Sequence, residues 1–216
     1  MWGSVNVFEA IHPLCGHENM LVGMALEPEW ILDMAETYSD LLISLMEILF
    51  AKSGKPDGVW IAEDLGFKGR PFMSPAMYEG LIQPSHAKLF GWSHGRGLKV
   101  ILHSCGFVEP LVPGLVDAGM DMLQAIEVKA GMDMPRMARR FGDRIGFMGG
   151  FDVREIVSND FTRIDAEFER VVRPLLDAGV PYVLHSDHSI PPQVDADTLR
   201  YFFAKALTAR RCLQVA

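Results

Sequence analysis

The chain has 216 residues, of which 49% are hydrophobic and 22% charged, and its formal net charge is −8 at pH 7. This length supports one sizeable core, so we expect a single domain over residues 1–216, and the acidic balance argues against a nucleic-acid-binding surface. We also expect a cytoplasmic protein, because no stretch reaches the roughly 18 apolar residues of a membrane span, no signal peptide opens the chain, and the three cysteines are sparse.

Six short apolar runs predict buried strands. The runs are apolar on both faces, as is typical of parallel strands that helices cover on both sides. In chain order they occupy residues 5–11, 58–62, 100–103, 122–126, 145–148 and 182–185.

Helical patterns lie between these runs, bounded by proline, glycine and capping residues. They predict helices over residues 28–51, 75–95, 109–118, 133–142, 161–178 and 195–209, with Asp133 and Asp195 as N-caps. Pro84 lies inside the second pattern, so we expect a kink or two helices there. The alternation of strand and helix predicts an α/β fold with a parallel sheet.

Polar residues gather where the predicted strands end. They are Glu63, Asp64, His103, Ser104, Cys105, Glu127, Asp152, His185, Asp187 and His188. Both (β/α)8 barrels and doubly wound sheets hold their active sites at strand carboxyl ends. A doubly wound sheet usually has a glycine-rich loop after its first strand, and this chain has a single glycine there, so the pattern favours the barrel.

His103 and Cys105 are the strongest candidates for chemistry. Residues two apart on a strand share one face, so both side chains can aim at one point, and both are common zinc ligands. The alternative is a core histidine beside a buried structural thiol.

Four motifs together resemble the uroporphyrinogen decarboxylase superfamily. They are residues 103–106 (His-Ser-Cys-Gly), the spaced residues Asp121, Glu127 and Asp133, residues 149–152 (Gly-Gly-Phe-Asp) and residues 187–192 (Asp-His-Ser-Ile-Pro-Pro). The superfamily includes haem-pathway decarboxylases and corrinoid-linked methyltransferases on (β/α)8 TIM barrels. A more distant resemblance is to the zinc domain of cobalamin-independent methionine synthase. The resemblance implies an incomplete barrel of about six βα units in which the two N-terminal units are missing.

The methyltransferase branch implies a specific zinc site. It binds zinc through a His-x-Cys pair and a later cysteine. His103 and Cys105 match the pair, and the later position aligns with His188, which leaves a fourth position for water or a thiol. The implied reaction is zinc-dependent methyl transfer from a methyl-corrinoid, carried by a partner corrinoid protein, to a thiol or similar small-molecule acceptor.

Further residues have expected roles around this centre. Asp187 would orient His188, and Glu63 is a candidate further ligand, so His188, Asp187 and Glu63 are the expected catalytic residues. The expected substrate contacts are His185, Glu127, Asp152 and Asp64. For each of them the alternative is a structural role, as a helix cap or within a loop turn.

Two other functions remain open. The first is decarboxylation of uroporphyrinogen in porphyrin biosynthesis, with His188 as proton donor. The second is a non-catalytic fragment or partner subunit. Because an incomplete barrel leaves strand edges unpaired, we expect a homo-oligomer or a second chain that supplies the missing strands.

Overall fold

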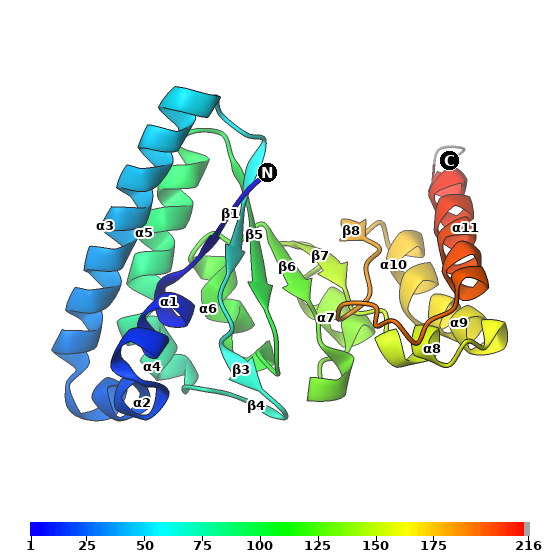
Figure 1. Cartoon of the computed structure of the whole chain (residues 1–216), viewed down its shortest axis with the longest axis horizontal. Coiled ribbons are helices and arrows are strands. Elements are labelled where there is room, and N and C mark those ends of the chain that lie inside the picture. Colours follow the sequence, from blue (N-terminus) through cyan, green and yellow to red (C-terminus); the bar gives the residue numbers. More distant parts are fainter. Residues whose placement is uncertain (214–216) are drawn as a thin grey trace. The chain divides into compact units, whose positions relative to one another are not determined.

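The structure is a computed structural model that describes residues 1–213, with side chains through residue 209 (Figure 1). The chain divides into two compact units, the first over Met1–Gln124 and the second starting at Ala125. The single domain expected from the sequence stays a prediction. None of the helices within residues 1–213 is long and apolar enough to cross a membrane.

The sheet of the first unit is parallel. Strands β1 (Trp2–Val5), β2 (Gly58–Ala62) and β5 (Lys99–Ser104) pair in that order, with Trp2 beside Val59 and Gly58 beside Lys99. Strand β6 (Met122–Ala125) follows β5 in the hydrogen-bonded order and reaches the boundary between the units.

Helices cover one face of this sheet. They are α1 (Val7–Cys15), α2 (His17–Leu26), α3 (Pro28–Ser53), α4 (Pro75–Leu81), α5 (Gln83–His94), η1 (Glu109–Leu111) and α6 (Val112–Asp117). A short hairpin of β3 (Gly66–Phe67) and β4 (Arg70–Pro71) follows β2. Figure 1 shows α3 and α5 running side by side. The core between helices and sheet includes Phe8, Tyr78 and Phe90, which are fully buried.

The second unit continues the alternation of strand and helix. Its elements are η2 (Val128–Ala130), α7 (Met134–Phe141), β7 (Gly146–Gly149), α8 (Val153–Val157), α9 (Phe161–Glu167), the π-helical turn η3 (Phe168–Val172), α10 (Arg173–Asp177), β8 (Tyr182–Val183) and α11 (Ala196–Leu213). Strands β7 and β8 are parallel. Gly149 has a φ of 116°, and a Cβ there would overlap the carbonyl of Ala125, so this turn requires glycine.

The α/β class with parallel strands is confirmed, and it is consistent with an incomplete TIM-barrel fold. The break at Pro84 is confirmed as well, because α4 and α5 are separate helices and Pro84 lies in the first turn of α5. Asp133 and Asp195 cap their helices as expected, accepting backbone N–H bonds from Arg136 and Thr198.

The strand expected over residues 5–11 was wrong. Strand β1 ends at Val5, and helix α1 begins at Val7. The apolar run is helical because Val7, Phe8 and Ile11 all point into the core at helical spacing. The carboxylate of Glu63 also accepts the N–H groups of Phe8 and Glu9, which the first turn of a helix leaves without partners.

Candidate metal centre

The candidate centre arises from the side-chain alternation of two neighbouring strands. Ala62 on β2 pairs with His103 on β5, so one step of alternation brings Asp64 level with Cys105. Asp64, His103 and Cys105 are all half-buried, whereas the residues between them, Glu63 and Ser104, are buried under the helices. Alternation therefore puts three metal-ligating side chains on the face of the sheet that the helices of this unit leave open.

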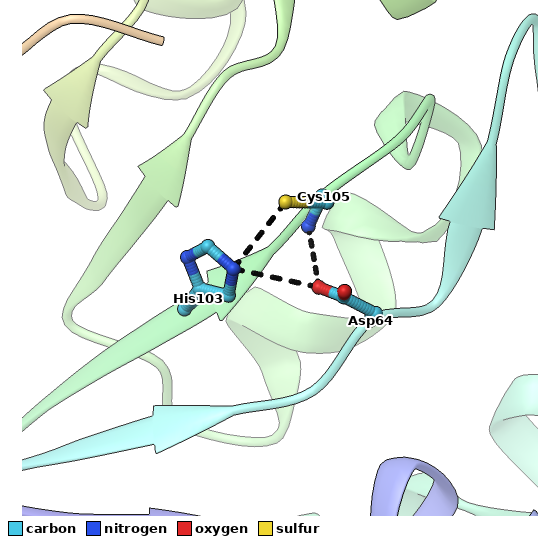
Figure 2. A group of neighbouring side chains, drawn as sticks. All are labelled: Asp64, His103 and Cys105. Carbon is cyan, nitrogen blue, oxygen red and sulfur yellow. Dashed lines mark hydrogen bonds and ion pairs between the residues drawn. The ribbon is translucent and has the colours of Figure 1, made fainter. Parts of the chain in front are cut away.

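Figure 2 shows that the three side chains point toward one another from the ends of β2 and β5. The Sγ of Cys105 lies 3.4 Å from the Nε2 of His103, which lies 3.5 Å from the Oδ1 of Asp64. One ligand atom from each residue lies within 4.8 Å of the other two. The side chains of His103 and Asp64 are 25% and 38% exposed, so the cluster is open to an incoming ligand.

The orientation of His103 suits metal ligation through Nε2. Its Nδ1 hydrogen-bonds to the Oε1 of Gln124, a buried residue on β6. Because Oε1 is an acceptor, Nδ1 carries the proton and the lone pair of Nε2 is directed at Cys105 and Asp64. The ring of Trp60 stacks on the imidazole at a centroid distance of 6.3 Å, which further limits its rotation.

The remaining residues of the His-Ser-Cys-Gly run hold the loop in place. The hydroxyl of Ser104 accepts the N–H of Leu65, and the N–H of Cys105 donates to Asp64 at 2.7 Å. Gly106 has a φ of 82°, and a Cβ there would overlap the backbone of Gly66 in the β3–β4 hairpin. The run therefore contains two candidate ligands and three contacts that hold their loop in place.

Glu63 lies on the opposite face of the sheet from the cluster and is fully buried. Its Oε1 accepts the N–H of Phe8 at 2.9 Å and bonds the Nε2 of His86 at 3.0 Å. The Nδ1 of His86 in turn lies 2.9 Å from the hydroxyl of Tyr78, whose pKa is raised well above its usual value by burial and by the charge of Glu63. These bonds tie α1, α4 and α5 to the end of β2. The catalytic role expected for Glu63 stays a prediction.

Glu9 adds a third carboxylate near the end of β2. Burial raises its pKa above the usual range, and the charges of Asp64 and Glu63 raise it further, while His12 and the backbone N–H of Asp64 act in the other direction. A cation that neutralised Asp64 would remove one of the causes that raise this pKa.

In the second unit, Asp187 is fully buried and both of its oxygens are occupied. They accept the N–H groups of Val128 and Val153 at 2.9 and 2.8 Å. Burial raises the pKa of Asp187, with smaller contributions from the charges of Asp152 and Glu127, and outweighs the two hydrogen bonds, which lower it.

The other predicted residues of the second unit have varied surroundings. Asp152 caps α8 through the N–H of Arg154 and also binds the guanidinium of that residue. Glu127 lies 3.4 Å from the Nζ of Lys129. The Nδ1 of His185 lies 2.5 Å from the carbonyl oxygen of Ser186, and His188 is exposed.

The family model of uroporphyrinogen decarboxylase (URO-D) matches residues 11–208, which is most of the chain. The chain belongs to the URO-D family. This match confirms the resemblance that the sequence motifs indicated. None of the curated proteins matches the chain.

Of the residues that the family resemblance indicated, the structure brings His103 and Cys105 together. It adds Asp64, which was expected to contact substrate rather than metal. His188, the third ligand implied by the family, belongs to the second unit, and its role stays a prediction. Sequence reasoning missed Gln124 and Glu9. Gln124 lies on a strand with no alternating burial, and it reaches His103 only through the order of the sheet. Glu9 lies in a segment expected to be a strand.

Proposed function

We propose that this URO-D family chain is a zinc-dependent enzyme that transfers a methyl group from a methyl-corrinoid to a thiol or similar acceptor. The observation that carries the proposal is the convergence of a carboxylate oxygen, an imidazole nitrogen and a thiol sulfur within 4.8 Å. These are the ligand types of zinc, and catalytic zinc sites use three protein ligands and keep one position open.

The residues present fit the ion. His103 and Cys105 would hold it together with one further residue, either Asp64 or His188, which is the third ligand that the family resemblance implies, so that one position stays open for the thiol. Bound zinc would hold a substrate thiol in its thiolate form, which is the form that attacks a methyl group.

The protein's own contribution is preorganisation. Gln124 keeps the proton on Nδ1 of His103, and the N–H of Cys105 fixes one oxygen of Asp64. The ring of Trp60 limits rotation of the imidazole. The three metal-ligating atoms are therefore held in place before the metal ion binds. This reduces the conformational entropy that is lost on binding.

Metal analysis of the purified full chain is the first test. We expect close to one equivalent of zinc, or its uptake on reconstitution. Cobalt(II) substituted for zinc should give a sulfur-to-cobalt charge-transfer absorption that Cys105→Ser abolishes. Cys15→Ser is the matched control, because Cys15 is another half-buried thiol but lies on α1, and it should leave the band unchanged.

Activity is then measured as demethylation of methylcobalamin in the presence of a thiol. Loss of activity in Cys105→Ser, His103→Asn and Asp64→Asn supports the proposal, and loss in His188→Asn extends the site to the second unit. Less than about a tenth of an equivalent of zinc, with no uptake on reconstitution, would rule the site out.

A second candidate is decarboxylation of uroporphyrinogen, favoured by the description of the family whose model matches the chain. Here exposed His188 would donate a proton to the substrate carbon that keeps the electron pair when CO2 departs. Incubation with uroporphyrinogen and chromatography of the products tests this reaction. Unchanged substrate with the zinc-loaded and the zinc-free chain contradicts it.

A further inference from the structure

A cavity of about 270 Å³ lies between two helical segments of the second unit. One wall comes from η3 and α10, and the other comes from α11 (Figure 1). Its floor is apolar and includes Phe168, Val172, Leu176 and Ala204. None of the residues predicted to form the metal or substrate site lines it. The proposed function therefore gives this cavity no role.

The cavity coincides with an irregular turn of helix. Residues Phe168–Val172 form the π-helical turn η3, in which the N–H of Arg173 donates to the carbonyl oxygen of Phe168, five residues earlier. Such a turn is wider than that of an α-helix, so its side chains leave the regular helical spacing, and π-turns are frequent at functional sites. Phe168, Glu169 and Val172 of this turn line the cavity. The irregular turn therefore lies where a bound ligand would contact the chain.

Two cationic side chains lie beside the apolar floor. The Nζ of Lys205 is 5.4 Å from the centroid of the Phe168 ring, and its ion pair with Asp165 holds it there. The Nε of Arg173 lies 3.6 Å from a carboxylate oxygen of Glu169, and 55% of the Arg173 side chain is exposed. An ion pair this long and this exposed contributes little, so the guanidinium can turn toward a ligand. One cation is therefore fixed at the cavity and the other is available to it.

We propose that this cavity binds a small carboxylate with an apolar chain. The chain would lie on the apolar floor, and the carboxylate would meet the guanidinium of Arg173 and the ammonium of Lys205. These two cations and one carboxylate, Glu169, line the cavity, so its net charge favours an anion. The volume is just below the usual range of small-molecule sites, about 300–1,000 Å³, so it suits a short chain. No residue of the candidate metal centre lines the cavity, so this inference and the proposed function fail independently.

Isothermal titration calorimetry of the full chain with octanoate tests the site. We expect one equivalent to bind with a Kd on the order of 0.1 mM, as is reasonable for a ligand of about ten non-hydrogen atoms. Hexanoate should bind about tenfold more weakly or less tightly still, because each buried CH₂ group strengthens binding by about fourfold. Absence of saturable octanoate binding below about 5 mM overturns the proposal.

Filling the cavity tests where octanoate binds. Ala204 is an exposed alanine of α11 on the cavity floor, and Ala204→Phe should weaken octanoate binding by about tenfold or more, because the ring takes the room of the ligand's chain. Ala196→Phe is the matched control, since Ala196 is exposed on the same helix but does not line the cavity. Circular dichroism verifies that both variants fold. Binding that Ala204→Phe leaves unchanged, or that both variants weaken equally, overturns the proposal.

The charge of the ligand is tested with octanol, which has the same chain but no carboxylate. Octanol should bind the wild-type chain about tenfold more weakly than octanoate. Arg173→Gln should remove this difference by weakening octanoate alone, because octanol makes no ionic contact that could be lost. Arg200→Gln is the matched control, since Arg200 is an arginine of α11 that is 76% exposed and lies outside the cavity lining. Equal binding of octanol and octanoate to the wild-type chain overturns the anionic ligand class, as does equal weakening by both arginine variants.

Discussion

Two carboxylates that follow strands, one in each unit, are surrounded in opposite ways. Asp64 accepts a backbone N–H from Cys105 and keeps 38% of its side chain exposed, beside an imidazole and a thiol. Asp187 is fully buried, and both of its oxygens accept backbone N–H groups. The first arrangement leaves lone pairs available to a ligand, whereas the second uses its lone pairs to join segments of the fold.

The difference shows why a carboxylate at a strand end is not by itself a catalytic group. Loops after parallel strands contain N–H groups without partners in the sheet, and a buried aspartate can accept two of them. Solvent exposure and the presence of other metal-ligating side chains nearby distinguish a carboxylate in a candidate metal site from a structural one.

The largest effect is expected for Asp187→Ala compared with Asp64→Ala. Loss of Asp187 leaves the buried N–H of Val153 and the partly buried N–H of Val128 without acceptors, which should lower the free energy of unfolding by about 3 kcal/mol. Asp64→Ala should cost about 1 kcal/mol or less, because the N–H that it releases is only partly buried. Urea unfolding followed by circular dichroism measures both.

Zinc content is measured on the same two variants, Asp187→Ala and Asp64→Ala. Asp64→Ala should lose metal while retaining the fold. Equal stability loss in both variants would show that Asp64 is as structural as Asp187, and the comparison between them would fail.

The next largest effect concerns the loop that carries Cys105. Gly106→Ala adds a Cβ that overlaps Gly66 at a φ of 82°, and we expect a loss of about 3 kcal/mol in stability together with weaker zinc binding. Gly69→Ala is the matched control, because Gly69 has the same φ of 82° but no atom within 4 Å of the added Cβ. It should cost about 1–2 kcal/mol through backbone strain alone. If the two variants unfold at the same urea concentration, the hairpin does not hold the loop.

A smaller effect is expected at the residue behind the imidazole. Gln124→Ala removes the acceptor for Nδ1 of His103, so the proton no longer stays fixed on that nitrogen. The affinity for zinc should fall about 10–100-fold with little change in stability. Competition with a chromophoric chelator measures the affinity. An unchanged affinity would mean that Trp60 alone suffices to orient the ring.

The sequence allowed the pairing of His103 with Cys105 to be predicted, because a strand period of two is independent of where the strand lies. The helix break at Pro84 could also be predicted from the sequence, because proline cannot continue the hydrogen bonds of a helix. The sequence favoured Glu63 over the adjacent Asp64 as a further ligand, whereas the structure groups Asp64 with His103 and Cys105. The two residues follow a strand that is apolar on both faces. A strand of that kind carries no signal for which face the helices cover.

Other parts of the site depend on contacts that are distant in sequence. The start of α1 at Val7 depends on Glu63, which is 55 residues later than Phe8 and accepts the N–H of that residue. Gln124 reaches His103 only because β6 follows β5 in the order of the sheet. Neither contact leaves a local pattern, so sequence periodicity alone could not find them.

The smallest effect is the pH dependence of two aspartates in the second unit, which should have opposite signs. Burial raises the pKa of Asp187, so its folded form favours the protonated acid, and its contribution to stability is lost as the pH rises through that pKa. Burial also acts to raise the pKa of Asp152, but the hydrogen bonds and charge of Arg154 lower it overall. The stabilising contribution of Asp152 is therefore present above the usual aspartate pKa and is lost as the pH falls through its own.

Thermal unfolding between pH 3 and pH 8 separates the two signs. Relative to wild type, Asp187→Asn should gain stability as the pH rises, while Asp152→Asn should lose stability over the same interval. A pKa that differs by one between the folded and unfolded states corresponds to about 1.4 kcal/mol of stability. Each pH-dependent change in stability is therefore small compared with the cost of removing the side chain of Asp187. Slopes of the same sign would mean that the N–H groups of Val128 and Val153 stabilise the Asp187 carboxylate enough to outweigh its burial. Asp187 would then be a stabilised carboxylate like Asp64, and solvent access together with the neighbouring imidazole and thiol would separate the candidate metal site from the structural cluster.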